Sequence, residues 1–168
     1  MDIRELRPEN AETLWRLRLE ALEREPYAFA MSPEEHRETT VDSMRAILAD
    51  SSGDAFVVGL FVEGDLRGMV GFMRERRIKL RHKGMIWGVY VSPAARGTGG
   101  GGAMMRKCLE RASSIEGLRQ VKLGVAEVNT AARALYESCG FEVYGKERGS
   151  LVVNGELVTE LHMVRVLR

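Results

Sequence analysis

The chain contains little cysteine and no long apolar segment. Its two cysteines, Cys108 and Cys139, lie in stretches of helical periodicity without a CxxC motif or a Cys/His spacing. The sequence therefore predicts neither a disulfide framework nor a zinc site, and no metal is expected. The longest apolar run, residues 55–62, is far short of the ~20 residues that cross a bilayer. Residues 1–5 lack the apolar segment of a signal peptide, so we expect a cytoplasmic protein without a membrane partner.

A surplus of charge of one sign is also lacking. The 168 residues carry 25 Lys and Arg against 24 Asp and Glu, and 45% are hydrophobic, which excludes a disordered chain and a protein that coats nucleic acid. The basic run at residues 74–83 has no interleaved aromatic residue, so we interpret it as a solvated connection and expect no nucleic-acid partner. Residues 1–54 are acidic, with 13 acidic and 7 basic side chains.

Apolar periodicity and turn residues predict the order of the elements. A first helix is expected over residues 11–25, and a second from the Ser32-Pro33 start to about residue 50. Two more helices should follow the glycine-rich segment and Asn129. The expected strands cover residues 3–6, 56–62, 66–73, 85–91, 121–126 and 141–144, and a closing hairpin turns at Asn154-Gly155 between residues 151–153 and 157–158. This order predicts one domain, residues 1–168, with a mixed α/β (α+β) sheet.

Five glycines between positions 97 and 102 separate a strand from a helix. Such a segment presents several backbone N–H groups and a helix N-terminus to one point, which favours an anion. Glycine is needed because a side chain would keep phosphate oxygens from the amides, and because nest-like turns require positive φ. The segment is therefore predicted to bind phosphate.

Two common phosphate-binding patterns fit this segment poorly. A P-loop needs a Lys followed by Ser or Thr after its last glycine, and the sequence has none. Gly97, Gly99 and Gly102 match the dinucleotide pattern GxGxxG, which also needs an acidic residue at the end of the next strand. Glu116 precedes that strand and Glu127 lies too far along the chain, so the dinucleotide interpretation is weak.

A third pattern accounts for two motifs together. The segment VYVSPAARGTGGG, residues 89–101, resembles the acetyl-CoA pyrophosphate loop of the GNAT superfamily of N-acetyltransferases, with Arg96, Gly99 and Gly101 at its defining positions. The segment NTAARALYESCGF, residues 129–141, is similar to the family's N-x-x-A-x-x-L-Y-x-x-x-G-F. The resemblance covers roughly residues 3–167, and the extra glycine at position 102 is its one oddity.

The resemblance implies a mostly antiparallel central sheet with flanking helices and one splayed parallel strand pair, residues 85–91 and 121–126. In the wedge between these strands the pantetheine arm of acetyl-CoA would pair with the backbone, and N–H groups near residues 89–91 would stabilise the oxyanion. The residues that we expect to bind acetyl-CoA are Val89, Tyr90, Val91, Arg96, Gly97, Thr98, Gly99, Gly100, Gly101, Gly102 and Asn129.

Tyr136 is the candidate catalytic residue. A phenol, with an ordinary pKa of about 10, can protonate a departing thiolate that it reaches, and the matching tyrosine is the usual general acid of the family. Cys108 belongs to an apolar stripe and Cys139 precedes a helix C-cap, so we expect both in the core and direct acyl transfer without an acyl-enzyme. Asn129 is expected to cap its helix as well as to contact the cofactor.

The general base is not evident in the sequence. Many family members place a Glu on the fourth strand or on the strand after the glycine helix, but residues 85–91 contain no acid and Gly124 occupies the middle of the later strand. Glu75, Glu127 and His82 are the remaining candidates, and a chain of water molecules is as good an alternative as any of them.

The resemblance implies transfer of an acetyl group from acetyl-CoA to a primary amine, carried by a small molecule or a peptide. Because the two helices before the hairpin flank the acceptor side in the family, the acidic residues between positions 9 and 42 predict a cationic acceptor. A homodimer is left open. A second hypothesis, a domain that binds acetyl-CoA as a sensor or structural ligand without turnover, also stays open because an obvious base is missing.

Overall fold

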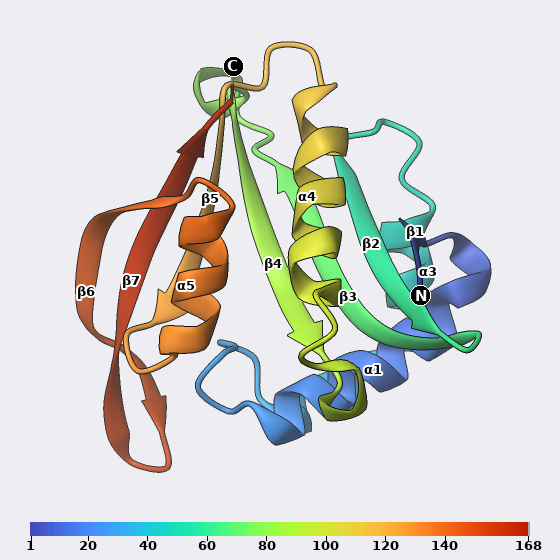
Figure 1. Cartoon of the computed structure of the whole chain (residues 1–168), viewed down its shortest axis with the longest axis horizontal. Coiled ribbons are helices and arrows are strands. Elements are labelled where there is room, and N and C mark those ends of the chain that lie inside the picture. The colour runs from blue at the N-terminus through green and yellow to red at the C-terminus, as the bar shows by residue number, and fades with distance from the viewer. Residues whose placement is uncertain (168) are drawn as a thin grey trace.

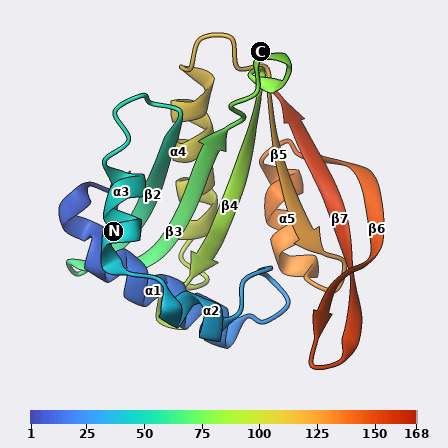
Figure 2. The ribbon, with the colours of Figure 1, turned by 180° about the vertical axis from the view of Figure 1, so that it is seen from behind.

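A single seven-stranded sheet runs through the computed structural model, which describes residues 1–167 (Figure 1 and Figure 2). The strand order is β1-β2-β3-β4-β5-β7-β6, and every neighbouring pair is antiparallel except β4 and β5. The mixed, mostly antiparallel sheet of the sequence prediction is thus confirmed. The strands are β1 (Asp2–Glu5), β2 (Ala55–Val62), β3 (Asp65–Arg74), β4 (Lys83–Val91), β5 (Gln120–Ala126), β6 (Glu142–Val153) and β7 (Glu156–Val166).

Helices cover both faces of the sheet. They are α1 (Ala11–Arg24), α2 (Pro33–Glu38), α3 (Val41–Leu48), α4 (Gly100–Ser113) and α5 (Thr130–Ser138). Helices α4 and α5 lie on one face, whereas α1, α2 and α3 lie on the other (Figure 1 and Figure 2). Each layer has its own apolar core, with Phe72 and Met104 buried under α4 and with Leu14 and Met69 buried under α1. Within residues 1–167, no helix is long and apolar enough to span a membrane.

The only parallel pair among the described strands is incomplete. Lys83–Met85 of β4 lie opposite Gln120–Lys122 of β5, and the register ends there. Beyond Met85 the two strands diverge, as the green and orange arrows of Figure 1 show. Backbone N–H and C=O groups need partners when they are buried, so the wedge offers two strand edges for pairing. The predicted splayed pair is confirmed.

Strand β4 carries a bulge where the wedge opens. Its register with β3 shifts between Trp87 and Tyr90, so Gly88 and Val89 together oppose one residue of β3. Gly88 has a φ of +64°, a left-handed conformation that glycine adopts without strain. As a result Trp87 and Tyr90, three residues apart, both pack on the α1 side, whereas Val89 packs on the α4 side.

The helix predicted over residues 33–50 is in fact two helices, α2 and α3. Thr39 and Thr40 between them have extended backbones, and their hydroxyls bond groups that a continuous helix would use differently. The Thr40 hydroxyl accepts from the Ser43 amide at 3.2 Å. The Thr39 hydroxyl donates to the His36 carbonyl at 2.6 Å and accepts from the Trp15 indole at 3.0 Å. The prediction was wrong here because two threonines act as caps.

The C-terminal hairpin is longer than predicted. The strands expected at residues 141–144 and 151–153 are parts of one strand, β6, which keeps its pairing with β7 through two bulges. The charged stretch between them was missed because most of it is exposed and shows no apolar alternation. The turn itself is as predicted, since Asn154 and Gly155 have φ values of +51° and +80°.

Replacing Thr40 by alanine tests the cap that divides the predicted helix. The change removes the oxygen that accepts from the Ser43 amide, so the free energy of unfolding should fall by about 1 kcal/mol, measured by urea denaturation. Thr40→Ser keeps that oxygen and should lose less than half as much. Equal losses in the two variants would contradict the capping role.

Candidate functional site

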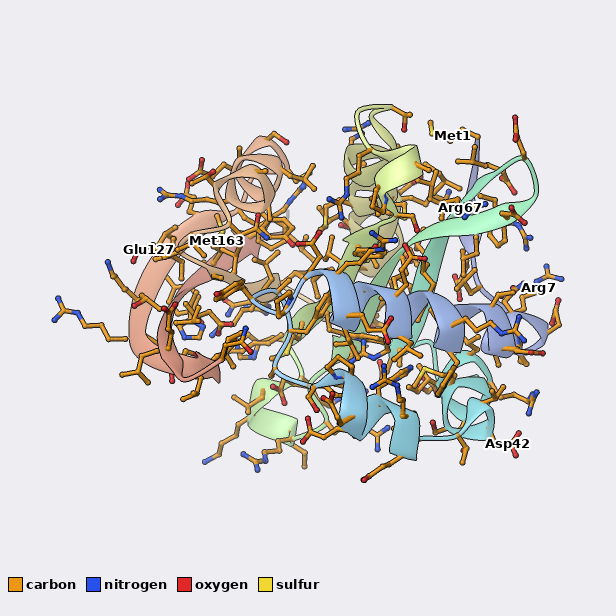
Figure 3. All side chains as sticks on the ribbon, turned by 90° about the horizontal axis from the view of Figure 1, so that it is seen from below. Met1, Arg7, Asp42, Arg67, Glu127 and Met163 are labelled. Atoms are coloured by element: carbon orange, nitrogen blue, oxygen red, sulfur yellow. The ribbon has the colours of Figure 1, made fainter. Side chains whose placement is uncertain are left out.

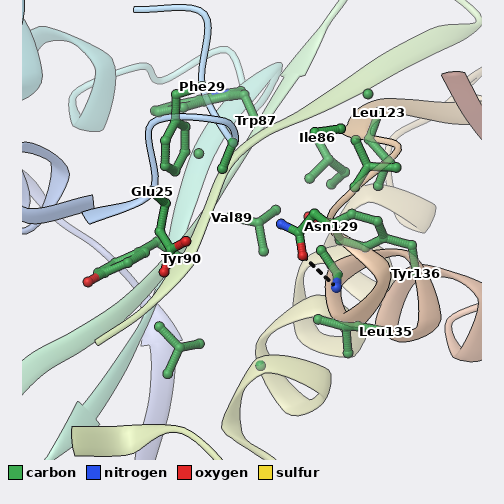
Figure 4. A pocket seen from close by; sticks show the side chains of 18 of the residues that line it. Glu25, Phe29, Ile86, Trp87, Val89, Tyr90, Leu123, Asn129, Leu135 and Tyr136 are labelled. Carbon is green, nitrogen blue, oxygen red and sulfur yellow. Dashed lines mark hydrogen bonds between the residues drawn. The ribbon is translucent and has the colours of Figure 1, made fainter. Parts of the chain in front are cut away.

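A cleft of about 880 Å³ opens where β4 and β5 diverge. Its walls also include the start of α4, one side of α5, part of β7 and the segment between α1 and α2. Figure 4 shows Phe29 and Trp87 on one side of the cleft, and Asn129, Leu135 and Tyr136 on the other. Seen from below (Figure 3), α1 lies across the half of the molecule that carries Arg7. It does not cover the other half, which carries Met163. The cleft therefore runs between the two halves of the sheet.

The glycine-rich segment supplies the beginning of α4. Gly97 and Gly99 have φ values of +75° and +79°, and Gly99 is the N-cap. The first intrahelical bond runs from the Ala103 amide to the Gly99 carbonyl at 3.1 Å. The amides of Gly101 and Gly102 precede that bond and are free to meet a ligand. Alternating backbone geometry and a helix N-terminus together make an anion-binding concavity.

The predicted glycines of this segment all line the cleft, but Thr98 does not. The Thr98 hydroxyl donates to the Ala95 carbonyl at 2.9 Å and so braces the loop. Gly100 allows a close approach, because a Cβ there would lie 2.6 Å from a Leu60 methyl. A Cβ at Gly102, the oddity in the family pattern, would meet only the flexible Arg106 side chain within 3.4 Å. A side chain at position 102 would therefore require only a shift of the Arg106 side chain.

Arg96 fastens this loop to α1. Its guanidinium lies 2.6 Å from a Glu25 carboxylate oxygen, and its Nε donates to the Val91 carbonyl at 2.9 Å. The guanidinium carbon also lies 5.8 Å from the centre of the Tyr90 ring, within the range of a cation–π contact. Arg96 lines the cleft, and its contacts hold the end of β4 and the end of α1 together. Its contact with the cofactor stays a prediction.

Asn129 and Tyr136 stand on the opposite wall, at the two ends of α5. The Asn129 side chain accepts from the Ala132 amide at 3.1 Å, which is the predicted helix cap (Figure 4). Tyr136 lines the cleft and is 6% exposed. Burial, and secondarily Cys139, raises the pKa of Tyr136 above its usual value. The phenol therefore keeps its proton throughout the neutral and mildly alkaline range.

None of the three side chains predicted as general bases lines the cleft. Glu127 lies 2.5 Å from the Lys146 ammonium on the neighbouring hairpin. Glu75 and His82 belong to the connection between β3 and β4, at the paired end of the wedge. Strand β4 diverges from β5 away from this end, so Glu75 and His82 lie at the closed end of the wedge.

A carboxylate that the sequence analysis missed lies in the cleft. Glu160 of β7 reaches over Gly124 of β5, where an added Cβ would come within 2.7 Å of its carboxylate. His162 lines the cleft beside it, with Nδ1 at 3.9 Å from Glu160 and Nε2 at 2.9 Å from Glu147. One carboxylate oxygen of each glutamate and one imidazole nitrogen of His162 all lie within 4.8 Å of one another. The sequence signal that could have revealed this group was a glycine inside β5, together with two polar residues at alternating positions of β7.

Among the described residues, five side chains of the charged types line the cleft: Arg18, Glu25, Arg96, Lys122 and Glu160. Of the acidic residues between positions 9 and 42, only Glu25 lines the cleft, and Arg96 neutralises it. Arg18 of α1 lines the cleft as well, with its guanidinium carbon 5.1 Å from the Trp87 ring centre. Sequence periodicity could not have found Arg18, because its neighbour Trp87 belongs to a strand 69 positions further along the chain.

Both cysteines are buried, as predicted. Cys108 packs in the core beneath α4, where burial raises the pKa of its thiol to about 12. A thiol with such a pKa is almost wholly protonated near pH 7 and is a poor nucleophile. Cys139 lies in the same core cluster, after α5. Neither thiol is among the residues that line the cleft.

Comparisons with known proteins agree with this geometry. Residues 14–141 match the model of the acetyltransferase (GNAT) family. A mycothiol acetyltransferase from Salinispora arenicola is 37% identical over 116 residues, which cover 68% of this chain and 38% of that protein. An acetyltransferase of the GNAT family from Streptococcus pneumoniae superposes with a TM-score of 0.90 at 24% identity, over 99% of both chains.

A putative acetyltransferase from Salmonella typhimurium, solved with its cofactor acetyl-CoA, superposes with a TM-score of 0.86 at 21% identity, over 99% of this chain and 94% of that one. The two structural likenesses each cover 99% of this chain. The match to the family model, over most of the chain, agrees with both sequence motifs. The chain belongs to the GNAT family of acetyltransferases.

Proposed function

We propose that the protein transfers an acetyl group from acetyl-CoA to a primary amine, by direct attack within a ternary complex. The observation that carries this proposal is the wedge between β4 and β5, which opens beside a helix that starts with unencumbered amides. A phosphate site and an unpaired strand edge in one cleft suit a ligand with a pyrophosphate and an extended amide-bearing arm. Acetyl-CoA has both.

The backbone would hold the reacting thioester. With its pyrophosphate on the amides of residues 97–102, the pantetheine arm runs along the edge of β4 from Val91 toward the bulge. The N–H groups near Val89 and Tyr90, where β5 no longer pairs with β4, would donate to the thioester oxygen. Donors placed at the developing oxyanion stabilise the tetrahedral intermediate.

Two side chains would move the protons. The amine nitrogen attacks the thioester carbon, a C–N bond forms, and the Glu160 carboxylate takes the proton that the attacking nitrogen loses. When the C–S bond breaks, the Tyr136 hydroxyl gives its proton to the departing thiolate. The raised pKa of Tyr136 keeps that proton on the phenol until the thiolate departs. The partly buried carboxylate of Glu160 takes the place of the acid that β5 lacks at Gly124.

Two narrower predictions about partners remain with this proposal. The acidic residues between positions 9 and 42 predict a cationic acceptor, yet within that range only Glu25 lines the cleft and Arg96 pairs with it. The support for a net cationic acceptor is therefore small. The homodimer stays a prediction.

The sensor hypothesis requires acetyl-CoA binding without turnover. Glu160 weakens its main argument, the absence of a base, because a carboxylate stands in the cleft after all. Release of CoA in the presence of a panel of primary amines, followed with a thiol reagent, separates the two hypotheses. Binding of acetyl-CoA by calorimetry with no CoA release from any amine would favour the sensor.

Replacing Gly101 by aspartate tests the phosphate site. A Cβ at this position meets only ordinary contacts at 3.6 Å, and an acidic residue in the first turn suits the helix dipole, so the fold should survive. A carboxylate about 4 Å from a phosphate repels it by ~1–4 kcal/mol, so affinity for acetyl-CoA, measured by calorimetry, should fall roughly 5–10³-fold. Gly101→Asn adds a side chain of the same size without the charge. Equal acetyl-CoA affinities of the two variants would contradict binding of the phosphate at this loop.

Replacing Tyr136 by phenylalanine tests the general acid. The ring and its packing against Phe141, with ring centres 6.2 Å apart, are kept, while the only transferable proton is lost. The rate of CoA release in a single turnover should fall by ~10²–10⁴-fold with little change in acetyl-CoA affinity. Because burial raises the pKa of Tyr136 above 10, the wild-type rate should show no loss from phenol ionisation below that pH. Tyr27→Phe, outside the cleft lining, is the matched control.

Replacing Glu160 by glutamine tests the proposed base. The single-turnover rate should fall by about 10²-fold or more at neutral pH. The deficit should narrow as the pH rises toward the pKa of the acceptor amine, because more of the amine then loses its proton to solvent. Glu127→Gln, whose parent pairs with Lys146 outside the cleft, should keep the wild-type rate. If Glu127→Gln is as slow as Glu160→Gln, Glu160 is not the base.

A further inference from the structure

Arg18 differs from the other arginines of α1. Arg16 pairs with Glu12 at 2.5 Å and Arg24 with Glu20 at 3.8 Å. Arg18 has no such carboxylate, and its Nη1 is buried without a hydrogen-bond partner among residues 1–167. Burial accordingly lowers the pKa of Arg18. A buried charged donor without a hydrogen-bond partner costs free energy. We therefore expect a ligand to supply the missing acceptor.

The surroundings of Arg18 place it on the acceptor side of the cleft. Its guanidinium packs against the Trp87 ring at 5.1 Å, and Trp87 lies on the α1 face, opposite α4 and α5. The bulge passes directly beneath it, because a Cβ added at Gly88 would lie 3.2 Å from Nη1. The glycine leaves open the space that the guanidinium faces.

The position relative to the proposed chemistry sets the size of the ligand. Gly88 is adjacent to Val89, whose N–H is a proposed donor to the thioester oxygen, and consecutive Cα atoms are about 3.8 Å apart. A group bound by Arg18 therefore lies only a few bonds from the amine that attacks that thioester. Glu160, the carboxylate proposed to receive the amine's proton, lines the same cleft.

We propose that Arg18 is an anion-binding subsite, and that the acceptor is a small amine that carries a carboxylate or a similar oxyanion close to its amino group, as an amino acid does. The planar guanidinium donates in a fork that matches a carboxylate. Phe29, Trp87 and Met85 line the cleft as well, which suits an acceptor with an apolar side chain. This inference rests on the proposed function, since it names the acceptor class of that reaction.

Matched acceptors that differ in one charge test the subsite. L-leucine and L-phenylalanine carry the carboxylate, and their amides lack it. Wild-type kcat/KM, corrected to the concentration of free amine, should be about 10–100-fold higher for each amino acid than for its amide. Arg18→Gln should remove that preference and leave the amides within about threefold. Arg16→Gln, on the same helix but exposed and outside the cleft lining, should behave as wild type.

Product binding separates the subsite from the reaction itself. N-acetyl-L-leucine and N-acetyl-L-leucinamide are compared by calorimetry on the protein saturated with CoA, so no turnover is needed. The acid should bind about tenfold or more tightly to the wild type, and the two should bind alike to Arg18→Gln. Arg18→Lys, which keeps the charge without the fork, should retain part of the preference and serves if the glutamine variant is unstable.

The outcomes distinguish the two proposals. Arg18-dependent binding of the acetylated acid, with no CoA release from any amine, would leave the subsite standing and refute the proposed acetyl transfer. CoA release with equal use of acids and amides, or with preference for the cationic amides, would refute the subsite and leave acetyl transfer standing. Loss of both acid and amide activity in Arg18→Gln would assign Arg18 a structural role and overturn the inference.

Discussion

The interrupted pairing between β4 and β5 is the constraint on which the rest of the structure depends. Three residues of each strand pair, and the strands then separate, so a stretch of backbone in the middle of the sheet is left to bind something other than the chain. The glycine loop follows directly from the free end of β4, and α5 follows β5. Helices α4 and α5 are therefore both placed by the same divergence, and the bulge at Gly88 shifts the register of β4 where the wedge opens.

Ion pairing decides which charges around the cleft remain for a ligand. Glu25 and Arg96 neutralise each other while they join α1 to the loop, and Glu20 accepts hydrogen bonds from Tyr90 and Ser92 at 2.8 Å each. Glu20 and Glu25 therefore hold α1 against the end of β4 and the glycine loop. Among residues 1–167, Arg18 has no partner of this kind, Glu160 has only a neighbouring imidazole, and Lys122, which also lines the cleft, lies over the Tyr144 ring. These are the charges that the proposed acceptor would meet.

Much of the fold and the cofactor half of the site could be predicted because their signals are local. About a dozen consecutive residues are enough to specify each of three features: the glycine-rich helix start, the Asn154-Gly155 turn and the helix that carries Tyr136. The acceptor half could not be predicted in the same way. Glu160 stands over Gly124 only because β7 inserts between β5 and β6, and Thr39, at the break between α2 and α3, accepts a hydrogen bond from Trp15 on another helix. Such contacts require the packed structure.

The unpaired edges of β4 and β5 also change what completes the fold. Free strand edges usually lie at the border of a sheet, where they invite association with other chains. Here two of them face each other inside the sheet, with α4 and α5 over one side (Figure 1). A thin extended molecule that pairs with them acts as an additional, non-covalent strand. Its binding free energy then contributes to the stability of the folded state, so that resistance to unfolding rises with the concentration of the bound ligand.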